Sequence, residues 1–249
     1  KPAEWKRPRN IFVCAHGDLF AENVPNDWII DVLTVVASNS RHHFQVLTKR
    51  AERMRDFMSR DDLLDDIYDN WYSFSDGPRE VWSWPLHNLW LGVSTEDQVR
   101  AEQRIPPLLE TPAAIRWISA EPLLGVINLR RLRYGLGHID ALEGHIHNSG
   151  RWGKVERARL HWVVAGGESG RGARPMHPDW ARQLRDQCAV TGVPFFFKQW
   201  GTWLDADQLL DRIEGGPAFI VKDGERWTPD RPLNHGDAAF LANLLGHPF

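Results

Sequence analysis

Residues 44–58, FQVLTKRAERMRDFM, contain the unit from which the fold is built. The apolar run Phe44–Leu47 is short and rich in strand-forming side chains, so it predicts a buried strand. Polar residues follow it at once, and the first of them, Thr48, is a candidate N-cap for a helical pattern that continues to Met58. The stretch therefore predicts a strand, a polar loop and a helix in immediate succession.

The same unit recurs along the chain. Five further short apolar runs predict strands: Ile11–Ala15, Leu89–Val93, Ile115–Ser119, Trp162–Ala165 and Phe195–Phe197. Other helical patterns begin at Pro25, at Asp61 and Asp62, at a Thr95–Gln98 capping box, and at His177-Pro178-Asp179 with its end at Gly192. Alternation of this kind predicts an α/β fold of parallel βα repeats joined by right-handed crossovers. We expect a partial or complete TIM-type barrel, with an open doubly wound sheet as the alternative.

Two segments depart from this alternation. Residues 126–160 are rich in Gly, His and Arg and predict a mobile insertion loop within a barrel domain that spans 1–203. Residues 204–249 are expected to form a C-terminal extension packed on the barrel. Within the extension, Asp223-Gly224 lies between two short apolar runs and predicts a small hairpin, and a final helix is expected over residues 236–245.

Composition excludes several classes of protein. The 249 residues carry a formal net charge of −3, which argues against a general polycation for nucleic acid. Two cysteines cannot build a disulfide framework or ligate an iron–sulfur cluster alone. No apolar stretch is long enough for a membrane span, so we expect a cytoplasmic protein without a membrane partner. Because the first residue is Lys1, we also expect a processed product or a fragment.

Polar residues follow every predicted strand. In parallel α/β folds functional side chains gather where the strands end and the next loops begin. These residues are His16 and Asp18; Thr48, Lys49 and Arg50; Ser94 and Glu96; Ser119 and Glu121; Glu168 and Ser169; Lys198 and Gln199. One interpretation is that Lys49 and Lys198 pair with Glu121 and Glu168 to close the barrel top. The favoured interpretation is a polar ligand or reaction site, because the pattern recurs at all six strands.

Other chemistries are less well supported by the sequence. Gly166-Gly167-Glu168-Ser169-Gly170 predicts either a tight turn or a backbone cradle for an anionic or adenosine-bearing ligand, and it lacks P-loop spacing. Cys14 and Cys188 are both expected to be core residues. The histidines of the insertion are interpreted as loop residues, and no metal site is predicted. The seven basic residues of 126–160 suggest a solvated face or, alternatively, a nucleic-acid contact.

Consecutive motifs over residues 5–203 closely resemble the bacteriophage gene-product-37/68 family, a domain of unknown function. The matching segments are Ile11–Val13 with Asp18–Phe20, Phe44–Arg50, Leu89–Ser94, Ser119–Gly125, Gly166–Gly170, Arg174–Met176 and Phe195–Gly201. The resemblance implies a radical S-adenosylmethionine-like protein, in which a three-cysteine segment ahead of a partial βα barrel holds a [4Fe-4S] cluster. That cysteine segment is absent from this chain, so no cofactor is assignable within it.

The resemblance and the strand-end pattern together give candidate roles. Catalytic candidates are Asp18, Lys49, Glu121, Glu168 and Lys198; candidates for cofactor contact are Ser94, Ser119, Gly166, Gly167 and Ser169; candidates for substrate contact are His16, Thr48, Arg50 and Gln199. The expected substrate is polar and, in one version of the hypothesis, related to nucleic acid. Two alternatives stand beside it. One is a scaffold that binds nucleic acid or a phage or host protein, and the other is a cluster-free barrel enzyme acting on a phosphorylated metabolite.

Overall fold

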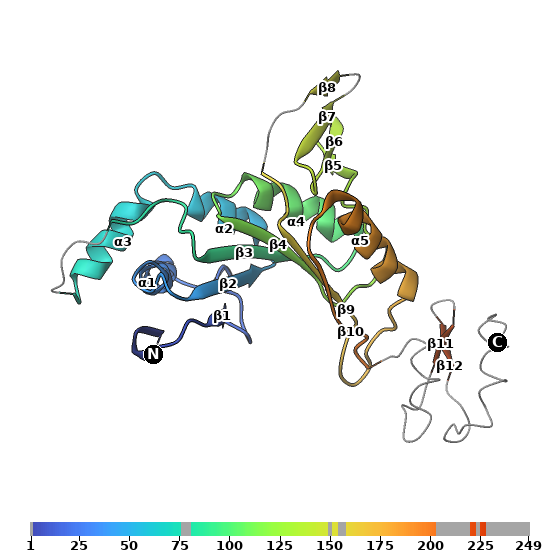
Figure 1. Cartoon of the computed structure of the whole chain (residues 1–249), viewed down its shortest axis with the longest axis horizontal. Coiled ribbons are helices and arrows are strands. Elements are labelled where there is room, and N and C mark those ends of the chain that lie inside the picture. Colours follow the sequence, from blue (N-terminus) through green and yellow to red (C-terminus); the bar gives the residue numbers. More distant parts are fainter. Residues whose placement is uncertain are drawn as a thin grey trace.

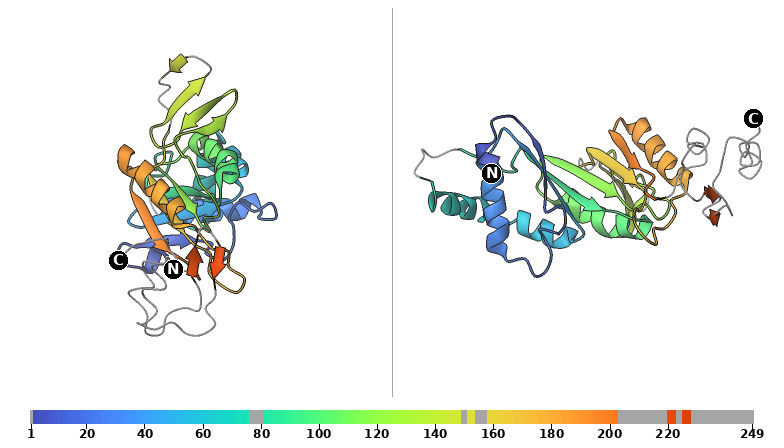
Figure 2. Two further views of the ribbon diagram at one scale, coloured as in Figure 1. Left: turned by 90° about the vertical axis from the view of Figure 1, so that its right-hand side faces the viewer. Right: turned by 90° about the horizontal axis from the view of Figure 1, so that it is seen from below.

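A computed structural model describes residues 2–75, 81–148, 151–153, 158–202, 220–222 and 225–227. Its centre is a six-stranded parallel sheet, curled as a half-barrel (Figure 1). The strands, in their order across the sheet, are β1 (Asn10–Val13), β2 (His43–Thr48), β3 (Leu89–Ser94), β4 (Ile115–Ala120), β9 (Trp162–Gly166) and β10 (Phe195–Gln199). All six predicted strands are confirmed, and the sheet runs from β1 at one end to β10 at the other (Figure 2).

The order of the strands distinguishes the two predicted architectures. Barrel strands that follow one another along the chain are also neighbours in the sheet, without the reversal that defines a doubly wound fold. Right-handed crossovers between such neighbours put the helices on one face of the sheet. The fold is therefore a partial TIM-like barrel, and the doubly wound alternative was wrong.

The helices are α1 (Asn26–Ala37), α2 (Ala51–Met58), α3 (Leu63–Tyr72), α4 (Gln98–Glu110) and α5 (Pro178–Thr191), with a short 3-10 helix η1 (Pro2–Glu4). Helix α4 packs on β3 and β4, and α5 packs on β9 and β10. The strand residues on the helix side are buried, among them Val46, Leu91 and Ile118. This packing places the hydrophobic core on the convex side of the half-barrel.

Two predicted helix caps were wrong. Thr48 lies at the end of β2, and its hydroxyl donates to Asp18 and accepts from the Arg50 N–H; α2 nevertheless begins at Ala51, with Arg50 as its N-cap residue. The start of α4 is capped by Asp97, whose side chain accepts from the Arg100 N–H, and not by the buried Thr95. Both threonines still belong to the strand ends, and their positions ahead of the first helical turn exclude them as caps. The predicted cap of α5 is confirmed, since the His177 ring accepts from the Asp179 N–H.

The insertion is not the expected loop. Its described residues form an antiparallel sheet of β5 (Leu132–Tyr134), β6 (Gly137–Asp140), β7 (His145–Asn148) and β8 (Arg151–Gly153), which stands away from the barrel (Figure 1). Leu132, Ile139 and Ile146 are paired across β5, β6 and β7 and are buried. Burial of this apolar row against the rest of the core gives the small sheet its stability.

The predicted C-terminal hairpin is confirmed as β11 (Ile220–Lys222) and β12 (Glu225–Trp227), which pair antiparallel. The predicted helix over 236–245 and the packing of the 204–249 extension lie outside the described residues. Among the helices that the structure describes, none is long and apolar enough to cross a membrane.

The sheet face opposite the helices carries a chain of aromatic rings. Phe12 meets Trp117 edge-on at 6.2 Å between ring centroids, and Trp117 lies 5.2 Å from Trp162. Trp90 continues the chain from Trp162 at 6.0 Å and reaches His43 at 5.7 Å. This concave face is only partly buried, and Phe12 is 43% exposed. It supplies an apolar floor below the ends of the strands.

Candidate ligand-binding site at the mouth of the half-barrel

A cavity of about 560 Å³ opens where the parallel strands end. Its apolar wall includes Phe12, Leu47 and Trp117, and its rim is polar. Eight of the fourteen predicted site residues line it: Asp18, Thr48, Lys49, Arg50, Ser94, Ser119, Glu121 and Lys198. Residues far apart in the sequence meet here because the ends of parallel strands lie along one edge of the sheet.

Asp18 ties the loop after β1 to the end of β2. One carboxylate oxygen accepts from the Thr48 hydroxyl at 2.7 Å and the Phe20 N–H at 3.0 Å, and the other accepts from the Lys49 N–H at 3.0 Å. With its oxygens engaged by the protein, Asp18 acts first as a positioning residue. It fixes the backbone from which Lys49 and Arg50 project into the cavity.

Lys49 belongs to a three-residue charge cluster. Its ammonium lies 3.0 Å from one oxygen of Glu96, and Arg104 of α4 donates to the other oxygen at 2.8 Å. Burial, the largest influence, raises the pKa of the Glu96 carboxyl, but the hydrogen bond from Lys49, a backbone hydrogen bond and the nearby cations outweigh it. The pKa therefore lies below its usual value, and Glu96 is held as an anion that orients Lys49.

Glu121 is the centre of the second polar cluster. It accepts from the Ser119 hydroxyl at 2.8 Å through one oxygen, and its other oxygen lies 3.0 Å from the Lys198 ammonium. Gly166 lies directly behind it, since a Cβ there would stand 2.9 Å from the carboxylate. Lys198 is about half exposed, so its ammonium retains capacity for an anionic group in the cavity.

Glu168 lies outside the cavity lining. Arg174 donates to it from two guanidinium nitrogens, Nε at 2.8 Å and Nη2 at 2.9 Å, and the Arg174 backbone N–H adds a third hydrogen bond at 2.8 Å. These bonds, the Arg174 side chain first, lower the pKa of Glu168 to about 2. Of the predicted lysine–carboxylate pairs at the barrel top, Lys198 and Glu121 form one. Glu168 pairs instead with Arg174 of its own loop.

The glycine segment forms a tight junction with the end of β10. The Gly167 N–H donates to the Gln199 carbonyl, and the Gly170 N–H donates to the Thr202 hydroxyl. The Gln199 amide in turn donates to Ser169 at 3.0 Å. A Cβ on Gly167 would overlap the Trp200 carbonyl oxygen. The glycines therefore serve close backbone packing, and those two amides are engaged within the protein.

Of the predicted residues, six are outside the cavity lining: His16, Gly166, Gly167, Glu168, Ser169 and Gln199. The prediction for Cys14 was also wrong. It is exposed, lines the cavity and adopts φ 54°, in the left-handed region, where the sequence predicted a core residue. Cys188 is a core residue as predicted, and burial raises the pKa of its thiol to about 12.

Arg104 was not predicted. It reaches the site from the middle of α4, eight residues after Glu96, and nothing in the local sequence distinguishes it from the other arginine of that helix. Glu96 was noted as a strand-end residue but not assigned to the site. Within the described ranges, no group of three or more His, Cys, Asp or Glu side chains is arranged to hold a metal ion.

The half-barrel and its polar mouth define an α/β protein with a polar cavity at the carboxyl ends of its strands. The chain belongs to the family described as protein of unknown function (DUF5131), whose model matches residues 1–230. No curated protein and no solved structure shows significant similarity to this chain.

Proposed function

We propose that this chain is the barrel portion of a radical S-adenosylmethionine-like phage or prophage enzyme, and that the mouth cavity binds the cofactor and a polar substrate. One observation carries the proposal. Anionic and cationic side chains, Glu121 and Lys198, meet above an aromatic floor in a cavity large enough for a nucleoside-sized ligand. The order of motifs along the chain, which resembles the gene-product-37/68 family, supports the same interpretation.

The donor set suits a zwitterionic aminocarboxylate attached to a flat base. Glu121 offers a carboxylate to an ammonium group, and Lys198 and Lys49 offer ammonium groups to a carboxylate. Phe12, which is 43% exposed, offers a ring surface to an adenine, and the buried Trp117 supports it edge-on. S-adenosylmethionine carries all three features. When bound, it would supply the sulfonium chemistry, while these residues hold and orient it.

The iron–sulfur cluster does not fit this chain alone. The sequence has two cysteines, and Cys188 is buried on α5 with a raised pKa, which disfavours the thiolate that iron requires. Under this proposal the thiolate ligands come from residues outside this chain. The role of the chain is then to bind and position ligands.

The complete coding sequence tests this proposal. Its product, expressed without oxygen, is expected to contain iron and sulfide and to convert S-adenosylmethionine to 5′-deoxyadenosine under reducing conditions. A product with neither iron nor cleavage activity would overturn the assignment as a radical enzyme. Binding of S-adenosylmethionine without its cleavage would support the cofactor site but contradict the radical reaction.

A cluster-free enzyme acting on a phosphorylated metabolite is the second candidate. It is favoured by the charges that line the cavity. Among the residues that the structure describes, three cations line it, Lys49, Arg50 and Lys198, against two carboxylates, Asp18 and Glu121. It is weakened by the engaged amides of Gly167 and Gly170, which would otherwise have served as a phosphate cradle. Inorganic phosphate that protects the chain against thermal unfolding more strongly than S-adenosylmethionine does would favour this candidate.

A further inference from the structure

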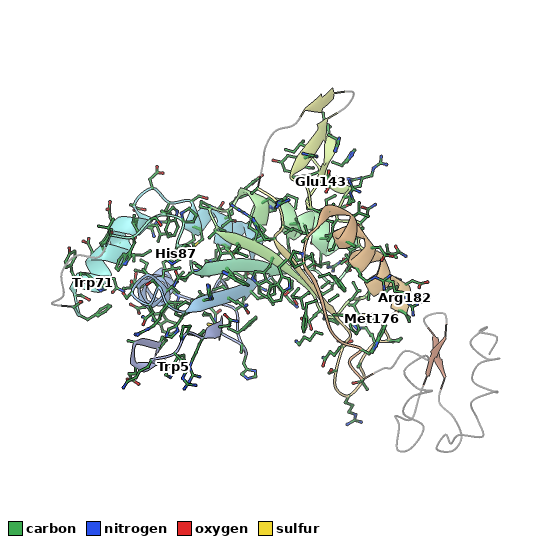
Figure 3. The ribbon with its side chains drawn as sticks, in the orientation of Figure 1. Trp5, Trp71, His87, Glu143, Met176 and Arg182 are labelled. Atoms are coloured by element: carbon green, nitrogen blue, oxygen red, sulfur yellow. The ribbon has the colours of Figure 1, made fainter. Side chains whose placement is uncertain are left out.

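A second groove, of about 680 Å³, lies between α5 and the small antiparallel sheet. In Figure 3, the label of Glu143, in the turn between β6 and β7, locates the small sheet, and the label of Arg182 locates α5. The sheet contributes His138 and His147, and α5 contributes Gln183 and Gln187. The groove shares no lining residue with the mouth cavity within the described part of the chain, so it is a separate site.

The side of the sheet that lines this groove carries a row of cationic and imidazole side chains. Arg133 is paired with His138 across β5 and β6, and His138 is paired with His147 across β6 and β7. The two imidazole rings stack at 4.6 Å with an interplanar angle of 17°. The neighbouring row on the opposite face, with Ile139 and Ile146, is buried, so the sheet presents its polar face to the groove.

The acidic residues of the groove are already engaged. Asp140 is 4% exposed, and its carboxylate accepts from Arg130 and from the Leu142 and Glu143 N–H groups. Asp186, at the α5 side, lies 2.7 Å from the Arg185 guanidinium. These pairs remove most of the negative charge that would repel an anion from the groove.

The cations next to the groove are less constrained. Arg131 and Arg133 are exposed, and neither has an acidic partner within 4 Å among the residues that the structure describes. The pKa of His138 lies below its usual value, first because of burial and then because of the nearby His147 and Arg131, while Asp140 acts in the opposite sense; the neutral ring is therefore favoured, and the two arginines supply the positive charge. Arg131 and Arg133 therefore place positive charge at this face of the described sheet that no described carboxylate within 4 Å neutralises.

We propose that this groove binds the phosphate backbone of a single-stranded nucleic acid. Arg131 and Arg133 would contact phosphates, and the imidazole N–H of His138 would donate to them. The exposed Gln183 amide on the opposite wall offers a donor and an acceptor to base edges. The whole 126–160 insertion adds seven basic residues against three acidic ones, which suits a polyanion. This inference does not depend on the function proposed for the mouth cavity.

Binding of a fluorescein-labelled single-stranded 12-mer to the whole chain, measured by anisotropy at several salt concentrations, tests the proposal. We expect the variant Arg131→Gln/Arg133→Gln to bind at least tenfold more weakly than the wild type. Its plot of log affinity against log salt should be less steep by about 1.4, since each single-strand phosphate contact contributes about 0.7. The exposed pair Lys6→Gln/Arg7→Gln removes the same charge at a distant surface and should bind like the wild type.

Three outcomes would overturn the proposal. One is a wild-type chain that does not bind the 12-mer at low salt, and another is an equal loss of affinity in both double variants. The third is competition by polyglutamate at the same charge concentration as the 12-mer, which would indicate an acidic protein partner. Because all four substitutions lie on exposed residues, thermal unfolding of each variant should match the wild type and show that folding is intact.

Discussion

Glu121 and Glu168 follow neighbouring strands, β4 and β9, and yet their carboxylates have different surroundings. Glu121 faces the mouth cavity and forms an ion pair with Lys198, whereas Glu168 forms an ion pair with Arg174 of its own loop. The sequence predicted that both carboxylates belong to the strand ends, because position after a strand is a local property. It did not predict their partners, since these depend on how the loop after β9 folds back and how far each side chain reaches.

The Glu168–Arg174 pair should make stability depend on pH. The pKa of Glu168 is about 2 in the folded protein against an ordinary 4.5, so the pair stabilises the fold above about pH 4.5. This contribution is lost as the pH falls from 4.5 toward 2. We expect Glu168→Gln to lower the free energy of unfolding by about 1 kcal/mol near pH 6, the upper range for solvent-exposed pairs.

Urea unfolding of wild type and Glu168→Gln between pH 6 and pH 3 measures this difference. It should shrink as the pH falls, because the unfolded chain takes up a proton on Glu168 below about pH 4.5, whereas the folded protein does so only near pH 2. Arg174→Gln should show the same trend. A difference that stays constant down to pH 3 would contradict the assignment of Arg174 as the cause of the low pKa.

At the scale of secondary structure, the strands were predictable and the insertion was not. Each barrel strand is a compact apolar run bounded by polar residues, so its composition identifies it. The strands β5 to β8 have three or four residues each, and the arginine, histidine, leucine and isoleucine residues in them form patterns too short to separate from a loop. Their stability comes from the buried row of Leu132, Ile139 and Ile146, which is a tertiary feature.

Gly92 shows how two neighbouring strands fit together. A Cβ at this position of β3 would stand 2.5 Å from the Trp117 indole of β4, which is 3% exposed. We expect Gly92→Ala to lower the free energy of unfolding by about 1–3 kcal/mol, the usual cost of overpacking a core. Equilibrium unfolding in urea measures the change.

Gly17→Ala is the matched control, because a Cβ there would have nothing within 4 Å. It should change stability by less than about 0.5 kcal/mol. Adding Trp117→Phe to Gly92→Ala should restore part of the loss, since the clash involves indole atoms that phenylalanine lacks or places elsewhere. Equal stability of Gly92→Ala and Gly17→Ala would contradict this packing.

At the scale of the whole molecule, the chain combines a half-barrel with a polar mouth and a separate groove on a basic insertion. The parallel βα order was sufficient to predict the partial barrel and to place eight site residues around one cavity. Sequence reasoning did not predict Arg104, the exposed Cys14, or the separation of the glycine segment from the cavity. Each of these depends on how distant elements pack against each other.

Under the proposed function, the mouth cavity binds S-adenosylmethionine through its paired charges. Isothermal titration of S-adenosylmethionine into the wild-type chain, Glu121→Gln and the distant surface variant Asp62→Asn tests this binding. We predict saturable binding by the wild type and by Asp62→Asn, with affinity at least tenfold lower in Glu121→Gln, or about 1.4 kcal/mol. A wild-type chain that does not bind S-adenosylmethionine, or a Glu121→Gln variant that binds it as tightly as the wild type, would contradict the claim.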